Sequence, residues 1–206
     1  MLKFRSAVMA GVGRCVRVAG LVGLLALTGC GSFYVDTATK EVPAAQFKKP
    51  ATARPVQLLF EFQTKGALNA RATDHLKAQV SEQVKASGLF SDVQDKAVAG
   101  GALLSIVLNN VPLTDNAFGK GFVTGLTFGL AGSQVSDGYV CTAKYLAEGQ
   151  AEPIVKTARH AIHTTVGAAA APANAVQAEN IEAAVRTMTR DIVSTSLNEL
   201  SQELAK

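Results

Sequence analysis

Two neighbouring stretches decide the fold that this sequence predicts: DGYVCTAKYLAE (Asp137–Glu148) and PIVKTARHAIHTTV (Pro153–Val166). Both contain Val, Thr, Tyr or Ile at many positions, and these residues favour β-strands. The residues between them, Gly149-Gln150-Ala151, have the composition of a turn. The sequence therefore predicts a long antiparallel hairpin.

Two more strands and a helix are predicted ahead of the hairpin. PVQLLFEFQ (Pro55–Gln63) and GALLSIVLNNV (Gly101–Val111) have the length and apolar content of strands, and the second is apolar enough to be buried. Asn69 is a suitable N-cap for a helix that stops at Gly88. This helix carries a narrow apolar stripe with a spacing of four residues, made of Ala72, Leu76, Val80 and Val84.

A second helix is predicted after the hairpin and an alanine-rich loop. Asn174 and Gln177 have the spacing of a capping box, which predicts that the helix begins there. Its broad apolar face consists of Ile181, Val185, Met188, Ile192, Leu197, Leu200 and Leu204. The order of elements predicts an α+β fold, a single domain over residues 56–206 with two helices on one face of a mostly antiparallel sheet of about four strands.

The first 29 residues differ from the rest of the chain. Basic residues precede the apolar run LVGLLAL (Leu21–Leu27), and small residues follow at Thr28 and Gly29. This is the layout of a secretory signal peptide, and the apolar run is too short for a stable membrane span. A start at Met9 in place of Met1 would leave a shorter signal of the same kind.

Leu27-Thr28-Gly29-Cys30 resembles the lipobox of bacterial lipoprotein precursors. The resemblance implies cleavage between Gly29 and Cys30, a diacylglycerol group on the Cys30 thiol, and a fatty acid such as palmitate on its new amino group. Three acyl chains would hold the protein on a membrane essentially permanently. In this family an aspartate after the cysteine favours the inner membrane, so Gly31 implies the outer membrane, facing the periplasm.

Residues 30–55 are predicted to be the lipidated N-terminus and a flexible linker. The segment holds three of the six prolines and shows no hydrophobic periodicity. A flexible chain of this length spans roughly 25–30 Å, enough to hold a domain away from the membrane. The predicted plan, with signal peptide, tether and small α+β domain, is similar to that of small, uncharacterised accessory lipoproteins of the Gram-negative envelope.

Removal of the signal peptide changes both the charge and the cysteine content. The chain has 20 Lys and Arg against 16 Asp and Glu, and the four basic residues before Cys30 leave 16 of each sign. A neutral mature protein gives no reason to expect nucleic-acid binding. Cys15 leaves with the signal and Cys30 carries lipid, so Cys141 alone is free and no intramolecular disulfide can form.

The stretch GFVTGLTFGLAGSQVS (Gly121–Ser136) carries no charge, and most of it belongs to a glycine-rich apolar segment, residues 117–134. As a helix the charge-free run would measure about 24 Å, which is short for a bilayer core. Three interpretations stay open: an apolar loop against the sheet, an element that contacts the membrane or a partner, and a helix for self-association. In the second, the contacting residues are Phe118, Phe122, Leu126, Phe128 and Leu130.

No group of residues in the sequence predicts catalysis, a metal or a cofactor. His160 and His163 are three apart in a predicted strand and so point to opposite faces, with no acidic residue or cysteine nearby to complete a metal site. Cys141 is interpreted as a small core residue, the alternative being a nucleophile paired with a histidine of the neighbouring strand. The sequence contains neither a nucleophile elbow nor a phosphate-binding loop.

These observations favour a non-catalytic accessory or assembly factor of an envelope complex. Its expected contacts are the membrane, through Cys30, and an envelope protein or a second copy, through residues 117–134. Two alternatives stay open, a periplasmic carrier of a lipid or small ligand and a periplasmic hydrolase, since pockets and catalytic distances do not follow from sequence.

Overall fold

The chain divides into two compact units, Met1–Gly31 and Ser32–Lys206. The computed structural model describes residues 31–113, 134–166 and 169–206, and the fold is therefore that of the second unit. Its elements are β1 Ser32–Asp36, the 3-10 helix η2 Ala44–Gln46, β2 Val56–Thr64, β3 Ala67–Leu68, α2 Ala70–Ala86, β4 Val93–Gln94, β5 Ala102–Pro112, β6 Gln134–Leu146, β7 Ile154–Thr165, β8 Ala175–Ala178 and α4 Ile181–Leu204.

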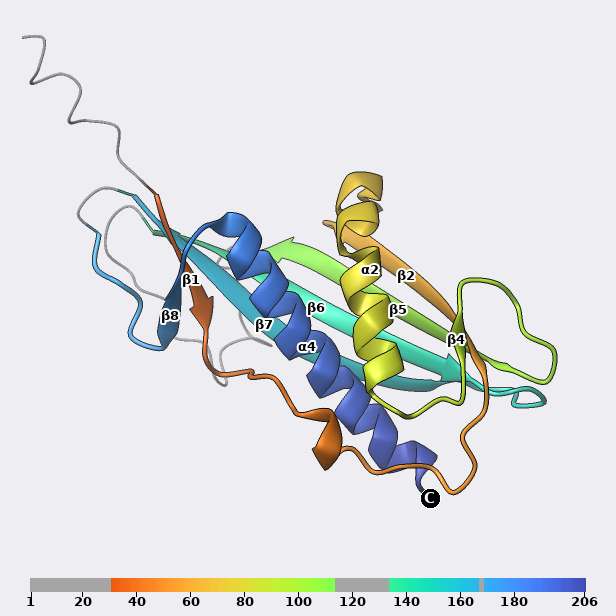
Figure 1. Cartoon of the computed structure of the whole chain (residues 1–206). Coiled ribbons are helices and arrows are strands. Elements are labelled where there is room, and N and C mark those ends of the chain that lie inside the picture. The colour runs from red at the N-terminus through yellow and green to blue at the C-terminus, as the bar shows by residue number, and fades with distance from the viewer. Residues whose placement is uncertain (1–30, 114–133, 167–168) are drawn as a thin grey trace, which may run out of the picture. The chain divides into compact units, whose positions relative to one another are not determined.

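The described strands form one eight-stranded mixed sheet in the order β3-β2-β5-β6-β7-β1-β8, with β4 paired to β2. Figure 1 shows α2 and α4 on the same face of this sheet. The prediction of an α+β fold with two helices is confirmed. The prediction of about four mostly antiparallel strands is wrong, because short edge strands extend the sheet and two pairings are parallel.

The predicted hairpin is the centre of the sheet. β6 and β7 pair antiparallel from Gln134↔Thr165 to Tyr145↔Ile154. The turn between them contains Gly149 with a φ of 78°, a left-handed conformation that glycine adopts without strain. This part of the sequence prediction is confirmed.

The parallel pair arises from the strand-helix-strand order at residues 56–112. β2 and β5 pair in parallel from Val56↔Ala102 to Thr64↔Asn110. A parallel pair needs a long connection that returns the chain to the same end of the sheet, and α2 provides it. The positions of the two strands were predicted correctly, but their parallel direction was not predicted.

The predicted boundaries of α2 are confirmed. The Asn69 side chain accepts a hydrogen bond from the Ala72 N–H at 3.1 Å, which satisfies one of the free donors at the helix start. Gly88, with a φ of 63°, follows the end of the helix. Leu76, Val80 and Val84 of the predicted stripe are buried.

The helix α4 begins later than the capping-box pattern predicted. Its N-cap is Asn180, whose side chain accepts from the Ala183 N–H at 2.8 Å. The Asn174 carbonyl accepts from the Thr37 N–H, and Ala175–Ala178 pair with β1. The start at Asn174 is wrong because these residues form an edge strand.

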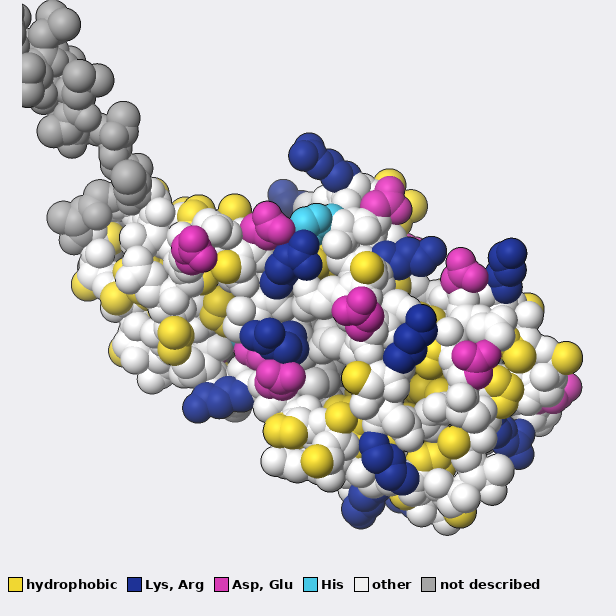
Figure 2. Space-filling model, in the orientation of Figure 1, with side chains coloured by type: hydrophobic (Ala, Val, Ile, Leu, Met, Phe, Trp, Pro, Cys, Tyr) yellow, Lys and Arg dark blue, Asp and Glu magenta, His cyan; other side chains and the backbone are white. Residues whose placement is uncertain are grey.

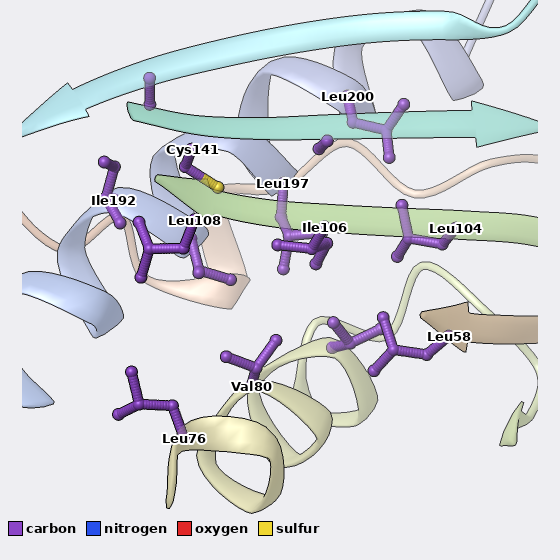
Figure 3. Close-up of a cluster of buried hydrophobic side chains, with 14 of the residues drawn as sticks. Leu58, Leu76, Val80, Leu104, Ile106, Leu108, Cys141, Ile192, Leu197 and Leu200 are labelled. Carbon is purple, nitrogen blue, oxygen red and sulfur yellow. The ribbon is translucent and has the colours of Figure 1, made fainter. Parts of the chain in front are cut away.

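The main hydrophobic core lies between the two helices and the sheet (Figure 3). On α4 most of the predicted face is buried or packed against the core, whereas Ile181 is 46% exposed. Figure 3 shows Leu58, Leu104, Ile106 and Leu108 from the sheet and Val80, Ile192, Leu197 and Leu200 from the helices. Within the described ranges, no helix has the length and the apolar run that crossing a membrane requires.

The prediction of a flexible linker up to residue 55 is wrong. β1 pairs with both β7 and β8, and Val35 and Phe47 are buried. Further along the segment, the Val42 and Lys48 N–H groups donate to the hydroxyls of Ser194 and Ser201 on α4, at 3.0 and 3.2 Å. These long-range contacts hold the segment on the domain.

Candidate functional site

The predicted lipidation site and the predicted contact residues lie outside the described ranges: Gly29, Cys30, Phe118, Phe122, Leu126, Phe128 and Leu130. Their roles therefore stay predictions. The structure places the residues that flank them. Gly31 leads directly into β1, and the glycine-rich apolar segment starts after β5 and ends at β6.

Two histidines on β7 are buried polar groups of the domain, each 1% exposed. His160 lies on the face covered by α4, where its Nε2 atom is 3.3 Å from the Asp191 Oδ2 atom. His163 lies on the other face, opposite Ser136 in the strand register. The sequence prediction that the two histidines point to opposite faces is confirmed.

His160 is part of the core. The Ala161 N–H donates to its Nδ1 atom at 2.8 Å, so Nδ1 is an acceptor and the Nε2 proton faces Asp191. Both ring nitrogens therefore have a protein partner. A fully enclosed imidazole with both nitrogens in use has no free position for a substrate or a metal.

His163 connects three strands through its two ring nitrogens. Its Nδ1 atom is 2.7 Å from the Ser136 Oγ atom of β6, and its Nε2 atom is 3.5 Å from the Asp36 Oδ2 atom of β1. The other Asp36 oxygen accepts from the Ala38 N–H at 2.7 Å. Asp36 and His163 are buried, whereas Ser136 is partly exposed.

The cluster of Ser136, His163 and Asp36 has the order of groups that activates a serine nucleophile in hydrolases. It also satisfies buried polar groups and holds β1 against the hairpin, which is a structural role. The sequence did not indicate Ser136, Asp36 or Asp191, because each comes from a different element than the histidine it contacts. Asp36, for example, is 127 residues from His163. No local spacing could indicate that contact.

Cys141 lies in the core and is not a candidate nucleophile. Burial raises the pKa of its thiol to about 11, and a hydrogen bond with the Ser196 side chain offsets only part of that effect. Since the thiolate is the reactive form, Cys141 stays protonated and unreactive near neutral pH. Figure 3 shows it among Leu108, Ile192 and Leu197.

The chain was compared with known proteins. No family model and no curated protein matches it. Among solved structures it is similar to a minor lipoprotein from Acinetobacter baumannii, with 15% identity and a TM-score of 0.40 over 75% of this chain and 92% of that one. Rare lipoprotein B from Shewanella oneidensis has 14% identity and a TM-score of 0.38, over 73% and 96%.

A dodecamer of PelC from Paraburkholderia phytofirmans has 11% identity and a TM-score of 0.36, over 84% of this chain and 98% of that one. Two of these three proteins are named lipoproteins. At such TM-scores the likeness is distant, and the function proposed for this chain rests on its own residues.

Clefts on the described surface are open and modest in size. One of about 430 Å³ lies beside the starts of α2 and α4, lined by Asn69, Arg71, His75 and Glu182 among others. Another of about 290 Å³ lies beside the stacked rings of Phe90 and Tyr145. In the same ranges no three His, Cys, Asp or Glu side chains gather as a metal site requires. These clefts are at the small end of the range for ligand sites.

Proposed function

We propose that this chain is the precursor of a lipoprotein, cleaved between Gly29 and Cys30 and held by lipid on Cys30 in the outer membrane, facing the periplasm. The observation that carries the proposal is the motif Leu27-Thr28-Gly29-Cys30 directly after the apolar run of a signal peptide. The boundary between the two compact units, at Gly31 and Ser32, falls beside the proposed cleavage site and supports it.

We propose further that the mature domain is a non-catalytic accessory or assembly factor of an envelope complex. The buried thiol and the enclosed His160 support this, because neither can reach a substrate. The proposed contact with a partner or the membrane is the glycine-rich apolar segment, through Phe118, Phe122, Leu126, Phe128 and Leu130.

A periplasmic hydrolase is the second candidate, and one observation favours it. The Ser136–His163–Asp36 cluster places a partly exposed hydroxyl 2.7 Å from an imidazole that faces a carboxylate. It ranks second because Asp36 and His163 are enclosed. Their contacts across β1, β6 and β7 satisfy buried polar groups, and this structural role accounts for the cluster without catalysis.

Metabolic labelling with a fatty acid tests the lipid anchor. The wild type should incorporate the label and Cys30→Ser should not, because the proposed acceptor thiol is absent. Cys141→Ser is the matched control and should be labelled like the wild type, since its thiol is buried. Equal incorporation by Cys30→Ser would exclude the anchor.

Affinity purification of the lipidated protein from detergent extracts tests the accessory role. Recovery of envelope proteins in stoichiometric amount supports an assembly factor. A tightly held lipid without protein partners would instead support a carrier.

A further inference from the structure

Four strand ends meet at one end of the sheet. β5 ends there at Pro112, β6 begins at Gln134, β7 ends at Thr165 and β1 begins at Ser32. Thr165 is the register partner of both Ser32 and Gln134, so these residues lie side by side on neighbouring strands. We call residues 32–34, 134–136 and 163–166 the anchor end.

The anchor end and the chain around it lack charge. No Asp, Glu, Lys or Arg occurs in residues 31–35, 134–136 or 164–178. Figure 2 shows mainly hydrophobic and uncharged side chains on the visible surface where β1 and β8 lie, while most Lys and Arg are over the rest of the domain. The charged residues that follow these three stretches are acidic, Asp36, Asp137 and Glu179, and Arg159 precedes the third.

Apolar side chains are exposed at this end. Val135 is 60% exposed and Val166 is 45% exposed. Val135 follows Gln134 on β6, and Val166 follows Thr165 at the end of β7, the strand that lies between β6 and β1. Adjacent strands are about 4.8 Å apart. Single exposed apolar side chains also occur elsewhere on the domain, for example Leu68 and Val155. The anchor end differs because its two exposed valines lie on neighbouring strands in stretches of chain without charged residues.

The residues that precede β1 indicate what the anchor end contacts. Cys30 is two residues from Ser32, a reach of at most about 7 Å even when extended. Because β1 is held in the sheet and no linker intervenes, acyl chains on Cys30 would bring the anchor end to the lipid surface. This step rests on the proposed lipidation of Cys30.

We propose that the anchor end lies against the lipid surface that holds Cys30, with Val135 and Val166 at the level of the headgroups. The hairpin then points away from the membrane, and its turn at Gly149 is about 35 Å distant, given 3.3 Å per residue along β7. Since residues 31–35, 134–136 and 164–178 carry no Lys or Arg, the proposed contact depends on apolar and neutral groups and does not require anionic lipid.

Tryptophan fluorescence tests this orientation, because the chain contains no Trp. Val135→Trp and Val166→Trp place a single reporter at the anchor end. Val155→Trp is the matched control, since Val155 is 47% exposed at the opposite end of β7. Each full-length, lipidated variant is reconstituted into neutral phosphatidylcholine vesicles with or without lipids brominated near the headgroup.

The expected result is that Val135→Trp and Val166→Trp lose most of their emission with brominated lipid, while Val155→Trp keeps its emission. Equal quenching of all three reporters would mean that the domain lies flat, and quenching of none would mean that the end is free in solution. Either result would overturn the proposal. A blue shift that depends on protein concentration in detergent alone would assign the surface to a second copy and would also overturn it.

The mass of the N-terminal peptide separates this inference from the one on which it rests. An unlipidated Cys30 would refute the proposed anchor. A lipidated Cys30 with unquenched reporters would refute only the orientation.

Discussion

At the scale of single residues, the domain places two histidine-aspartate pairs on the two faces of one strand. A buried donor or acceptor without a partner costs roughly 1–3 kcal/mol, so each pair is stabilising mainly because each member satisfies the other. The opposite directions of His160 and His163 follow from the alternation along a strand, and could be predicted. Their partners could not, because Asp36 and Asp191 come from distant parts of the chain.

Asp36→Ala should lower the free energy of unfolding by about 1–3 kcal/mol, because it leaves the His163 Nε2 atom and the Ala38 N–H without their partner. Chemical denaturation measures this change. Val176→Ala, at a 63% exposed position of β8, is the control and should change stability by less than about 0.5 kcal/mol.

Labelling with a fluorophosphonate decides between the two proposed functions. A fluorophosphonate should not label the wild type if the cluster is structural. Labelling that disappears in Ser136→Ala would show a reactive serine and would support the hydrolase.

At the scale of elements, those with strong local patterns were predictable and those formed by distant pairing were not. The hairpin, α2 and the strands at residues 55–63 and 101–111 follow from periodicity, capping and β-branched content. β1 and β8 are short, and β8 is rich in alanine, so their order comes from pairing with each other and with β7. The capping-box pattern at Asn174 failed because the same polar residues suit a turn at an edge strand.

Phe47→Ala tests whether residues 31–55 are part of the domain. Phe47 is buried although Ala-Ala-Gln precedes it and Lys-Lys-Pro follows it, and removing a buried Phe side chain costs about 3–5 kcal/mol. Urea denaturation should therefore show a clearly lower midpoint for this variant.

The neighbouring exposed residue provides the control, and Gln46→Ala should leave the midpoint nearly unchanged. If the segment were a flexible linker, both variants would unfold like the wild type.

At the scale of the whole molecule, the order of the chain brings its least polar parts together. Gly31, the last residue of β5 and the first residue of β6 are all near the anchor end, so the glycine-rich apolar segment leaves and enters the domain there. The sequence alone left a membrane or partner contact of this segment as one of three interpretations, and did not indicate where the segment joins the domain. The register of β1, β6 and β7 shows that the start of β6, where the segment ends, lies at the same end of the sheet as the start of β1.

Changing both Phe122 and Phe128 to Ser tests the segment in a soluble protein that begins at Gly31. If these side chains contact lipid, each contributes about 1.5–3 kcal/mol of apolar burial to membrane binding and little to folding. The melting temperature should then stay close to that of the parent protein, while binding to neutral liposomes disappears. Leu59→Ser, at a 45% exposed position of β2 away from the anchor end, is the control and should bind like the parent. A large fall in melting temperature, together with no liposome binding by the parent, would instead mean that the segment packs on the sheet as an apolar loop, because the phenylalanines would then be supporting the fold and not the contact.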